Sequence, residues 1–142
     1  MRASERAPSS PFRVLERRHR LAEIVERGGG VAVSAAFNYA TSLGKLKHYK
    51  QAKVLLLRNI PVARRVLGEG HKITLKMRWT YATALYMDPA ATLDDLREAV
   101  ATLEDAERTA RRVFGGAHPH TKIMEHNLPH ARAELRAREA SG

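Results

Sequence analysis

The sequence predicts an all-α fold, an α-solenoid built from antiparallel helix pairs. The first supporting observation is a repeat: the eleven residues that begin at Arg64 return at Arg111, with six positions identical. The second is that apolar residues recur at intervals of three and four between these markers, which is the spacing of one helix face. A sequence repeated inside one domain-sized chain indicates one supersecondary unit stacked on copies of itself.

The repeat markers divide the chain into repeat 1 (residues 31–74), repeat 2 (75–121) and a closing helix with a tail (122–142). Tyr39 and Tyr81 lie 42 residues apart, whereas the stretches at Arg64 and Arg111 lie 47 apart. Five residues are therefore inserted in repeat 2. The spacing assigns them to residues 87–92, in a turn, because a longer loop costs little free energy.

The region before the repeats divides into two parts. Residues 1–11 contain two prolines and three serines, so we expect a disordered leader. Within residues 12–30, an apolar pattern separated by Arg and Glu predicts an amphipathic helix over 12–27, followed by a glycine joint. The Arg- and Ser-containing start is compatible with a transit peptide, against which Glu5 and Glu16 count.

The repeats and the closing segment predict five helices. They span residues 31–46, 48–67, 72–86, the segment between Thr92 and Gly115, and 122 to about 138. The first carries a stripe of small residues that lets a neighbouring helix approach closely. This stripe consists of Ala32, Ala35, Ala36, Tyr39, Ala40 and Leu43. The inward positions of the later helices include Ala52, Leu56, Ile60, Ala63, Leu75, Ala82, Leu85, Leu96, Leu103, Val113, Ile123 and Leu128.

Several local signals mark where these helices begin and end. Gly44 and Gly68 are expected to end helices, Gly68 in a left-handed conformation. Thr92 with Asp95 predicts a capping box, and Pro119 suits a first helical position.

Prolines and histidines give further local predictions. Pro61 predicts a bend or a new segment near Asn59, and Pro129 predicts a similar kink. His71 and His118 recur at one position of the repeat, and we expect each to fasten its loop to the following helix.

Composition limits the possible functions. The chain has no cysteine, which excludes disulfides and thiolate metal sites. No run approaches the roughly 18 apolar residues that cross a bilayer, and no signal-peptide core is present, so we expect a cytoplasmic protein without a membrane span. The net charge is +10, and residues 31–91 hold ten Lys or Arg against two acids. This bias favours an acidic partner, although a solvated basic face explains it equally well.

The paired helices and the glycine-histidine loops carry a family resemblance. The chain resembles tetratricopeptide repeats of the kinesin light chain type, in which a helix ends in Val-Leu-Gly before a His-Pro-x-Thr segment. The second copy matches at Val113, Gly115, His118, Pro119 and Thr121. The first matches at Val66, Leu67, Gly68, His71 and Thr74, with Lys72 in place of proline. The resemblance covers about residues 31–139 and implies a right-handed superhelix.

This resemblance implies a scaffold that binds an extended peptide, often an acidic one, in a concave groove lined by the first helix of each pair. The implied peptide-binding residues are Phe37, Asn38, Thr41, Lys45, Lys76, Trp79, Thr80, Thr83, His126, Asn127 and His130. Asn38 and Asn127 would hold the peptide backbone through their amides, and Thr80 replaces the amide in repeat 2. Trp79 and Phe37 are also typical of core packing.

Other functions have weaker support. The spacing of His126 and His130 can ligate a metal, but Pro129 lies between them and the Glu of a metalloprotease motif is missing, so we expect no metal and no cofactor. No catalytic constellation is placed by a motif, so we expect no enzyme. The alternative function is a basic module that binds nucleic acid or another polyanion through residues 45–78. Weak self-association of a short array is a third possibility.

Overall fold

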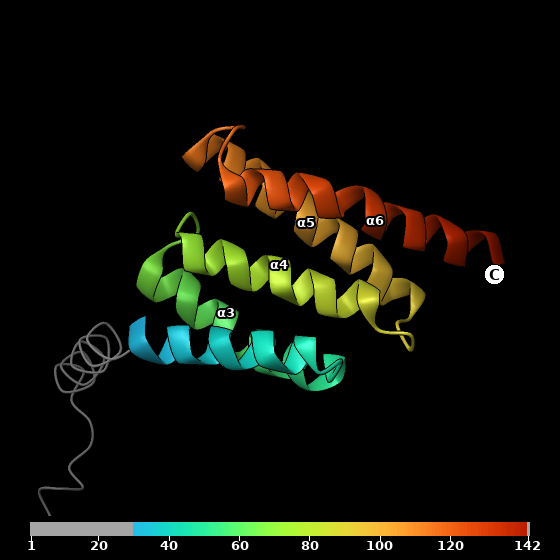
Figure 1. Cartoon of the computed structure of the whole chain (residues 1–142), viewed down its shortest axis with the longest axis horizontal. Helices are drawn as coiled ribbons and strands as arrows, with labels where there is room; N and C mark the ends of the chain where they lie inside the picture. Colours follow the sequence, from blue (N-terminus) through green and yellow to red (C-terminus); the bar gives the residue numbers. More distant parts are fainter. Residues whose placement is uncertain (1–29, 142) are drawn as a thin grey trace, which may run out of the picture.

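The computed structural model describes residues 30–141, and every regular element within them is an α-helix (Figure 1). The prediction of an all-α fold is therefore confirmed for this range. The predicted leader (1–11) and amphipathic helix (12–27) lie outside the described residues. The helices span residues 30–45, Tyr49–Leu67 (α3), Lys72–Met87 (α4), Leu93–Phe114 (α5) and Pro119–Ser141 (α6).

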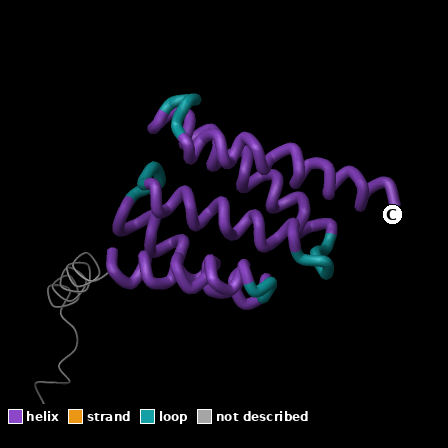
Figure 2. Tube along the Cα trace, viewed as in Figure 1, coloured by secondary structure: helices purple, strands orange, loops and turns teal. Residues whose placement is uncertain are grey.

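Helices that follow one another in sequence also lie side by side, joined by short loops (Figures 1 and 2). α3 packs against α4, α4 against α5 and α5 against α6, and α4 also contacts α6. Helix 30–45 joins this arrangement through Leu43, which packs with Ala52 of α3 and Ala84 of α4. Helix 30–45, α4 and α6 are therefore successive neighbours on one side of the molecule.

The core between these helices is rich in alanine. Ala40, Ala52, Ala63, Ala82 and Ala99 are all fully buried. Small side chains allow helix axes to approach closely, because the ridges of one helix fit the grooves of the next. The larger buried side chains fill the space between the layers, and they include Leu56, Leu75, Met77, Leu85, Leu96 and Leu103.

Five predicted inward positions are wrong, and three of them lie in helix 30–45. Tyr39 is 60% exposed, and Ala32 and Ala35 are also exposed, whereas Val33 of the same helix is buried and Phe37 is half-buried.

The other two lie beside the turn between α5 and α6. Val113 is 48% and Ile123 is 38% exposed. Thr121 and Met124 are buried there and occupy the face that packs on α5.

Helix 30–45 ends within one residue of the predicted end at Leu46, but Gly44, which was expected to mark that end, is not its last residue. Its end is a Schellman motif: the N–H of His48 donates to the carbonyl of Leu43 at 2.8 Å, and that of Lys47 to Gly44 at 2.9 Å. Lys47 takes the left-handed conformation that this motif requires, with φ of 64°. A lysine therefore serves where glycine is usual, and Gly44 lies inside the helix.

The two repeat glycines end α3 and α5 as predicted, but in a different conformation. Gly68 has φ 97° and ψ 159°, and Gly115 has φ 90° and ψ 162°. These angles lie beyond the left-handed helical region, in a region that essentially only glycine occupies. The recurrence of glycine at this position therefore has a strict backbone cause.

The two internal prolines do not break their helices. α3 continues through Pro61, and α6 through Pro129. Both prolines are exposed. Leu57 and Glu125 lie four residues before them, so their carbonyls are the ones that receive no helical hydrogen bond, and both residues are also exposed. Water can therefore satisfy those carbonyls, which lowers the cost of each proline. Of the two outcomes predicted for Pro61, a bend or a new segment near Asn59, the new segment is therefore wrong.

The five inserted residues of repeat 2 are shared between a loop and a helix. The loop before α5 (residues 88–92) is two residues longer than the loop before α3 (residues 46–48), and α5 has 22 residues against 19 in α3. The prediction that the whole insertion lies in the turn is therefore only partly right.

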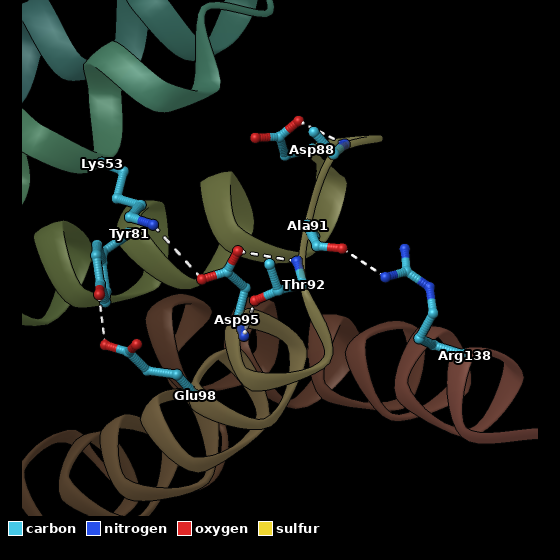
Figure 3. Close-up of polar contacts among 9 residues, drawn as sticks. Lys53, Tyr81, Asp88, Ala91, Thr92, Asp95, Glu98 and Arg138 are labelled. Carbon is cyan, nitrogen blue, oxygen red and sulfur yellow. Dashed lines mark hydrogen bonds and ion pairs between the residues drawn. The ribbon is translucent and has the colours of Figure 1, made fainter. Parts of the chain in front are cut away.

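The loop of repeat 2 ends in the predicted capping box (Figure 3). The Thr92 hydroxyl accepts from the N–H of Asp95 at 3.1 Å, and the Asp95 carboxylate accepts from the N–H of Thr92 at 2.9 Å. These two bonds satisfy donors that a helix start otherwise leaves free. Asp95 also pairs with Lys53 of α3 at 3.5 Å, so the start of α5 is tied to the previous pair.

Candidate functional site

Two hollows adjoin along the side of the molecule formed by helix 30–45, α4 and α6. The apolar hollow, of about 250 Å³, lies between helix 30–45 and α4 over the start of α3. The polar hollow, of about 620 Å³, lies between the end of α4, the loop that follows it and α6. Thr83 and Met87 line both hollows, so they form one continuous surface.

The apolar hollow has aromatic walls and a floor of small residues. Phe37, Tyr49 and Trp79 line it, and the buried Ala52 and Ala84 lie at its base. Because small residues occupy the floor, the space that larger side chains would fill stays open. Such an enclosure suits one bulky apolar side chain of a ligand.

Positive charge flanks the apolar hollow. Lys45 lines it, and Nζ of Lys76 lies 5.9 Å from the centre of the Phe37 ring, within the range of a cation–π contact. A ligand anchored here would therefore meet lysines beside its apolar group.

The three threonines on this surface present acceptors rather than donors. The hydroxyls of Thr41, Thr80 and Thr83 each donate to the carbonyl four residues earlier, at 2.8 to 2.9 Å. A hydroxyl has one proton and two lone pairs, so each still accepts a hydrogen bond. The groups that they can bind are the N–H donors of an extended backbone or of polar side chains.

The two asparagines expected to hold a peptide backbone differ in their surroundings. Asn38 is exposed and lies outside both hollows. Asn127 lines the polar hollow, but its Nδ2 donates to the carbonyl of Ile123 at 2.7 Å and its Oδ1 accepts from the hydroxyl of Tyr86 at 2.9 Å. Asn127 therefore already bridges α6 and α4 within the molecule.

The polar hollow combines imidazoles with acidic groups. His126 and His130 line it with ring centroids 5.1 Å apart, next to Glu134. Asp88 lies opposite, at the end of α4, where its carboxylate accepts from the N–H of Ala90.

One wall of the polar hollow is held by a contact between distant parts of the chain. Arg138 of α6 donates to the carbonyl of Ala91 at 2.5 Å, which ties the loop after α4 to the last turns of α6 (Figure 3). The hollow therefore has a fixed outer rim.

Nine of the eleven predicted peptide-binding residues line one or both hollows. They are Phe37, Thr41, Lys45, Trp79, Thr80, Thr83, His126, Asn127 and His130. Lys76 adjoins the surface through Phe37, and Asn38 lies apart from it. Sequence reasoning missed the residues Tyr49, Tyr86, Met87, Asp88, Glu134 and Arg138.

The repeated loop histidines form caps, as predicted. Nδ1 of His71 accepts from the N–H of Ile73, and Nδ1 of His118 accepts from the N–H of His120, both at 3.1 Å. His118 also stacks on Phe114, with centroids 4.5 Å apart. Burial lowers the pKa of His120, and Lys76, His118 and Lys72 add to the effect.

Between residues 30 and 141, no three His, Asp or Glu side chains lie close enough together to hold a metal ion. In the same range, no helix is both long and apolar enough to span a membrane.

Comparison with known proteins adds no identification, since no protein-family model, curated protein or solved structure matches this chain.

Proposed function

We propose that the chain is a protein-interaction scaffold that binds an extended peptide along the two adjoining hollows. The observation that carries this proposal is that residues of three helices, far apart in sequence, line one continuous surface that includes Thr83 at its middle. An extended chain crossing successive helices suits such a surface. The threonine hydroxyls would accept hydrogen bonds from its backbone N–H groups.

The apolar hollow is the anchor site in this proposal. A bulky apolar side chain of the peptide would fill the space between Phe37 and Trp79 and lose its contact with water there. Lys45 and Lys76 would attract acidic residues beside the anchor. The proposal assigns a binding role to this surface and no catalytic step.

We further propose that the helices form a short α-solenoid of the tetratricopeptide type, related to the kinesin light chain repeats. Four observations support this. Helices that follow one another in sequence pack against each other. α4 also contacts α6, as the first helices of two successive pairs would. The turns at Gly68 and Gly115 share one unusual backbone conformation. The histidine caps at His71 and His118 repeat with the same spacing.

A selection from random peptides displayed on phage tests the proposed binding. It would compare the full chain with Thr83→Tyr, which places a bulky side chain in the wall that both hollows share. The matched control is Ala101→Tyr, at an exposed position of α5 that lines neither hollow. We expect enriched peptides that share a motif, bind the control and lose binding to Thr83→Tyr. Equal binding to both variants would place the site elsewhere.

A second candidate function is polyanion binding by the basic face around α3. Lys47, Lys50, Arg58, Arg65 and Lys72 are exposed, and none pairs with an acid among residues 30–141. Three of the four arginines of α5 differ, because Arg97, Arg108 and Arg111 have acidic partners. Binding to single-stranded DNA that weakens steeply with salt would favour this function, and no binding at low salt would exclude it.

A further inference from the structure

The two hollows occupy equivalent places in successive repeats. Residues of helix 30–45 correspond in the repeat to residues of α4 that lie 42 positions later. Thr41 of the apolar hollow therefore corresponds to Thr83 of the polar hollow. Residues of α4 correspond to residues of α6 that lie 47 positions later, so the α4 side of the apolar hollow corresponds to the α6 side of the polar hollow. The matching pairs are Trp79 with His126, Thr80 with Asn127, Thr83 with His130 and Met87 with Glu134.

The chemistry of these equivalent places is opposite. The position of Lys45 in the first hollow is taken by Met87 in the second, and that of Lys76 is taken by Ile123. The position of Met87 is taken by Glu134. Among these matched positions, two cations are lost and one carboxylate is gained.

The electrostatic environment of the polar hollow favours a cation. Two carboxylates, Asp88 and Glu134, line it against one guanidinium, that of Arg138. Arg138 already donates to Ala91.

The end of α4 adds to this negative potential. Among α3 to α6, α4 alone has no basic residue in its last turn, so the negative end of its helix dipole is not compensated. Burial and the charge of Glu134 raise the pKa of Tyr86.

We propose that the polar hollow binds a lysine or arginine side chain of the same peptide whose apolar residue anchors in the apolar hollow. The ligand is thus bipartite: an apolar anchor beside acidic residues, followed or preceded by a basic residue. This inference rests on the proposed peptide-binding function and adds a specificity to it. The carboxylate of Glu134 and the carbonyl end of α4 would accept hydrogen bonds from the cation.

Helix spacing sets the distance between the two parts of the ligand. Neighbouring helix axes lie about 8–10 Å apart, and an extended chain advances about 3.3 Å per residue. The basic residue should therefore lie roughly two to four positions from the anchor.

The test is a selection of random phage-displayed peptides on the full chain, repeated on Glu134→Lys. Its matched control is Glu139→Lys, which makes the same charge change at an exposed position of α6 outside both hollows. We expect the wild type to enrich peptides with a basic residue near the anchor. Glu134→Lys should weaken binding of those peptides by about tenfold and select an acidic residue there, while Glu139→Lys should behave like the wild type.

Two outcomes would overturn the inference in distinguishable ways. Peptides that share the apolar anchor but lack a basic position, or keep it on Glu134→Lys, would refute the basic subsite and leave the proposed peptide binding in place. No enrichment on the wild type would refute both. Circular dichroism of each variant would show that the helices are retained.

Discussion

The conformation of Gly68 predicts that alanine in its place lowers the free energy of unfolding through backbone strain alone. A Cβ added at Gly68 or Gly115 would meet no atom within 4 Å, so Gly68→Ala and Gly115→Ala create no clash. Their φ and ψ values lie in a region that alanine almost never adopts, at a cost of about 1–3 kcal/mol each. With a urea slope of about 2 kcal/mol per molar, a loss of 2 kcal/mol lowers the unfolding midpoint by about 1 M.

Gly44 supplies the matched control. It lies inside helix 30–45, and a Cβ added there also meets nothing within 4 Å. Because alanine favours a helix interior over glycine by about 0.5–1 kcal/mol, Gly44→Ala should raise the free energy of unfolding.

Urea unfolding of the three variants, followed by circular dichroism, measures both effects. If Gly68→Ala and Gly115→Ala were as stable as the wild type, the backbone explanation of the repeated glycine would be wrong.

Three further variants test other parts of the account. Thr92→Ala should lower the free energy of unfolding by about 1 kcal/mol, because α5 loses its capping box, and an unchanged urea midpoint would contradict this. The hydrogen bond from the buried Arg78 holds the pKa of Asp105 below its ordinary value of 3.8. The pair therefore stabilises the fold above pH 3.8, and this stabilisation is lost as the pH falls below 3.8. In Asp105→Asn, the free energy of unfolding should fall less steeply in acid than in the wild type. Burial lowers the pKa of His120, so the unfolded chain binds the proton more readily than the folded one, and the free energy of unfolding should decrease as the pH falls below 6.5. This decrease should be smaller in His120→Gln. An equal decrease in both proteins would show that another group titrates.

The ends of the helices were predictable because their causes are local. The Thr92–Asp95 box and Pro119 are recognised from residues within one turn of each other, and both predictions are confirmed. The role of Lys47 at the end of helix 30–45 was not predictable, since a lysine rarely adopts the left-handed conformation. The new segment predicted as one outcome of Pro61 does not occur, because the cost of a helical proline depends on which face of α3 meets water.

Buried faces were less predictable, since burial depends on neighbours. Tyr39 and Tyr81 are equivalent in the repeat, yet Tyr39 is 60% and Tyr81 only 5% exposed. Tyr81 lies in α4, which packs against both α3 and α5, and its hydroxyl donates to Glu98 of α5. No property of the tyrosine itself separates the two cases.

The candidate site was predictable to the extent that it follows the repeat. Residues such as Thr41, Thr83 and Trp79 were found because equivalent positions share a face. The outer rim of the polar hollow was not found, since Arg138 and Ala91 are 47 residues apart and meet only in the folded chain. Glu134 was not found either, since its importance depends on the charge of the other residues that line the polar hollow.

The central claim is that the surface of the two hollows binds a peptide. The most direct test is a titration of the ¹⁵N-labelled full chain with an enriched peptide, followed by amide chemical shifts. We expect the largest shifts around Thr41, Thr83 and Asn127, with little change at Lys50 and Arg58 on the basic face of α3. Shifts concentrated on that basic face, with none along helix 30–45, α4 and α6, would contradict it.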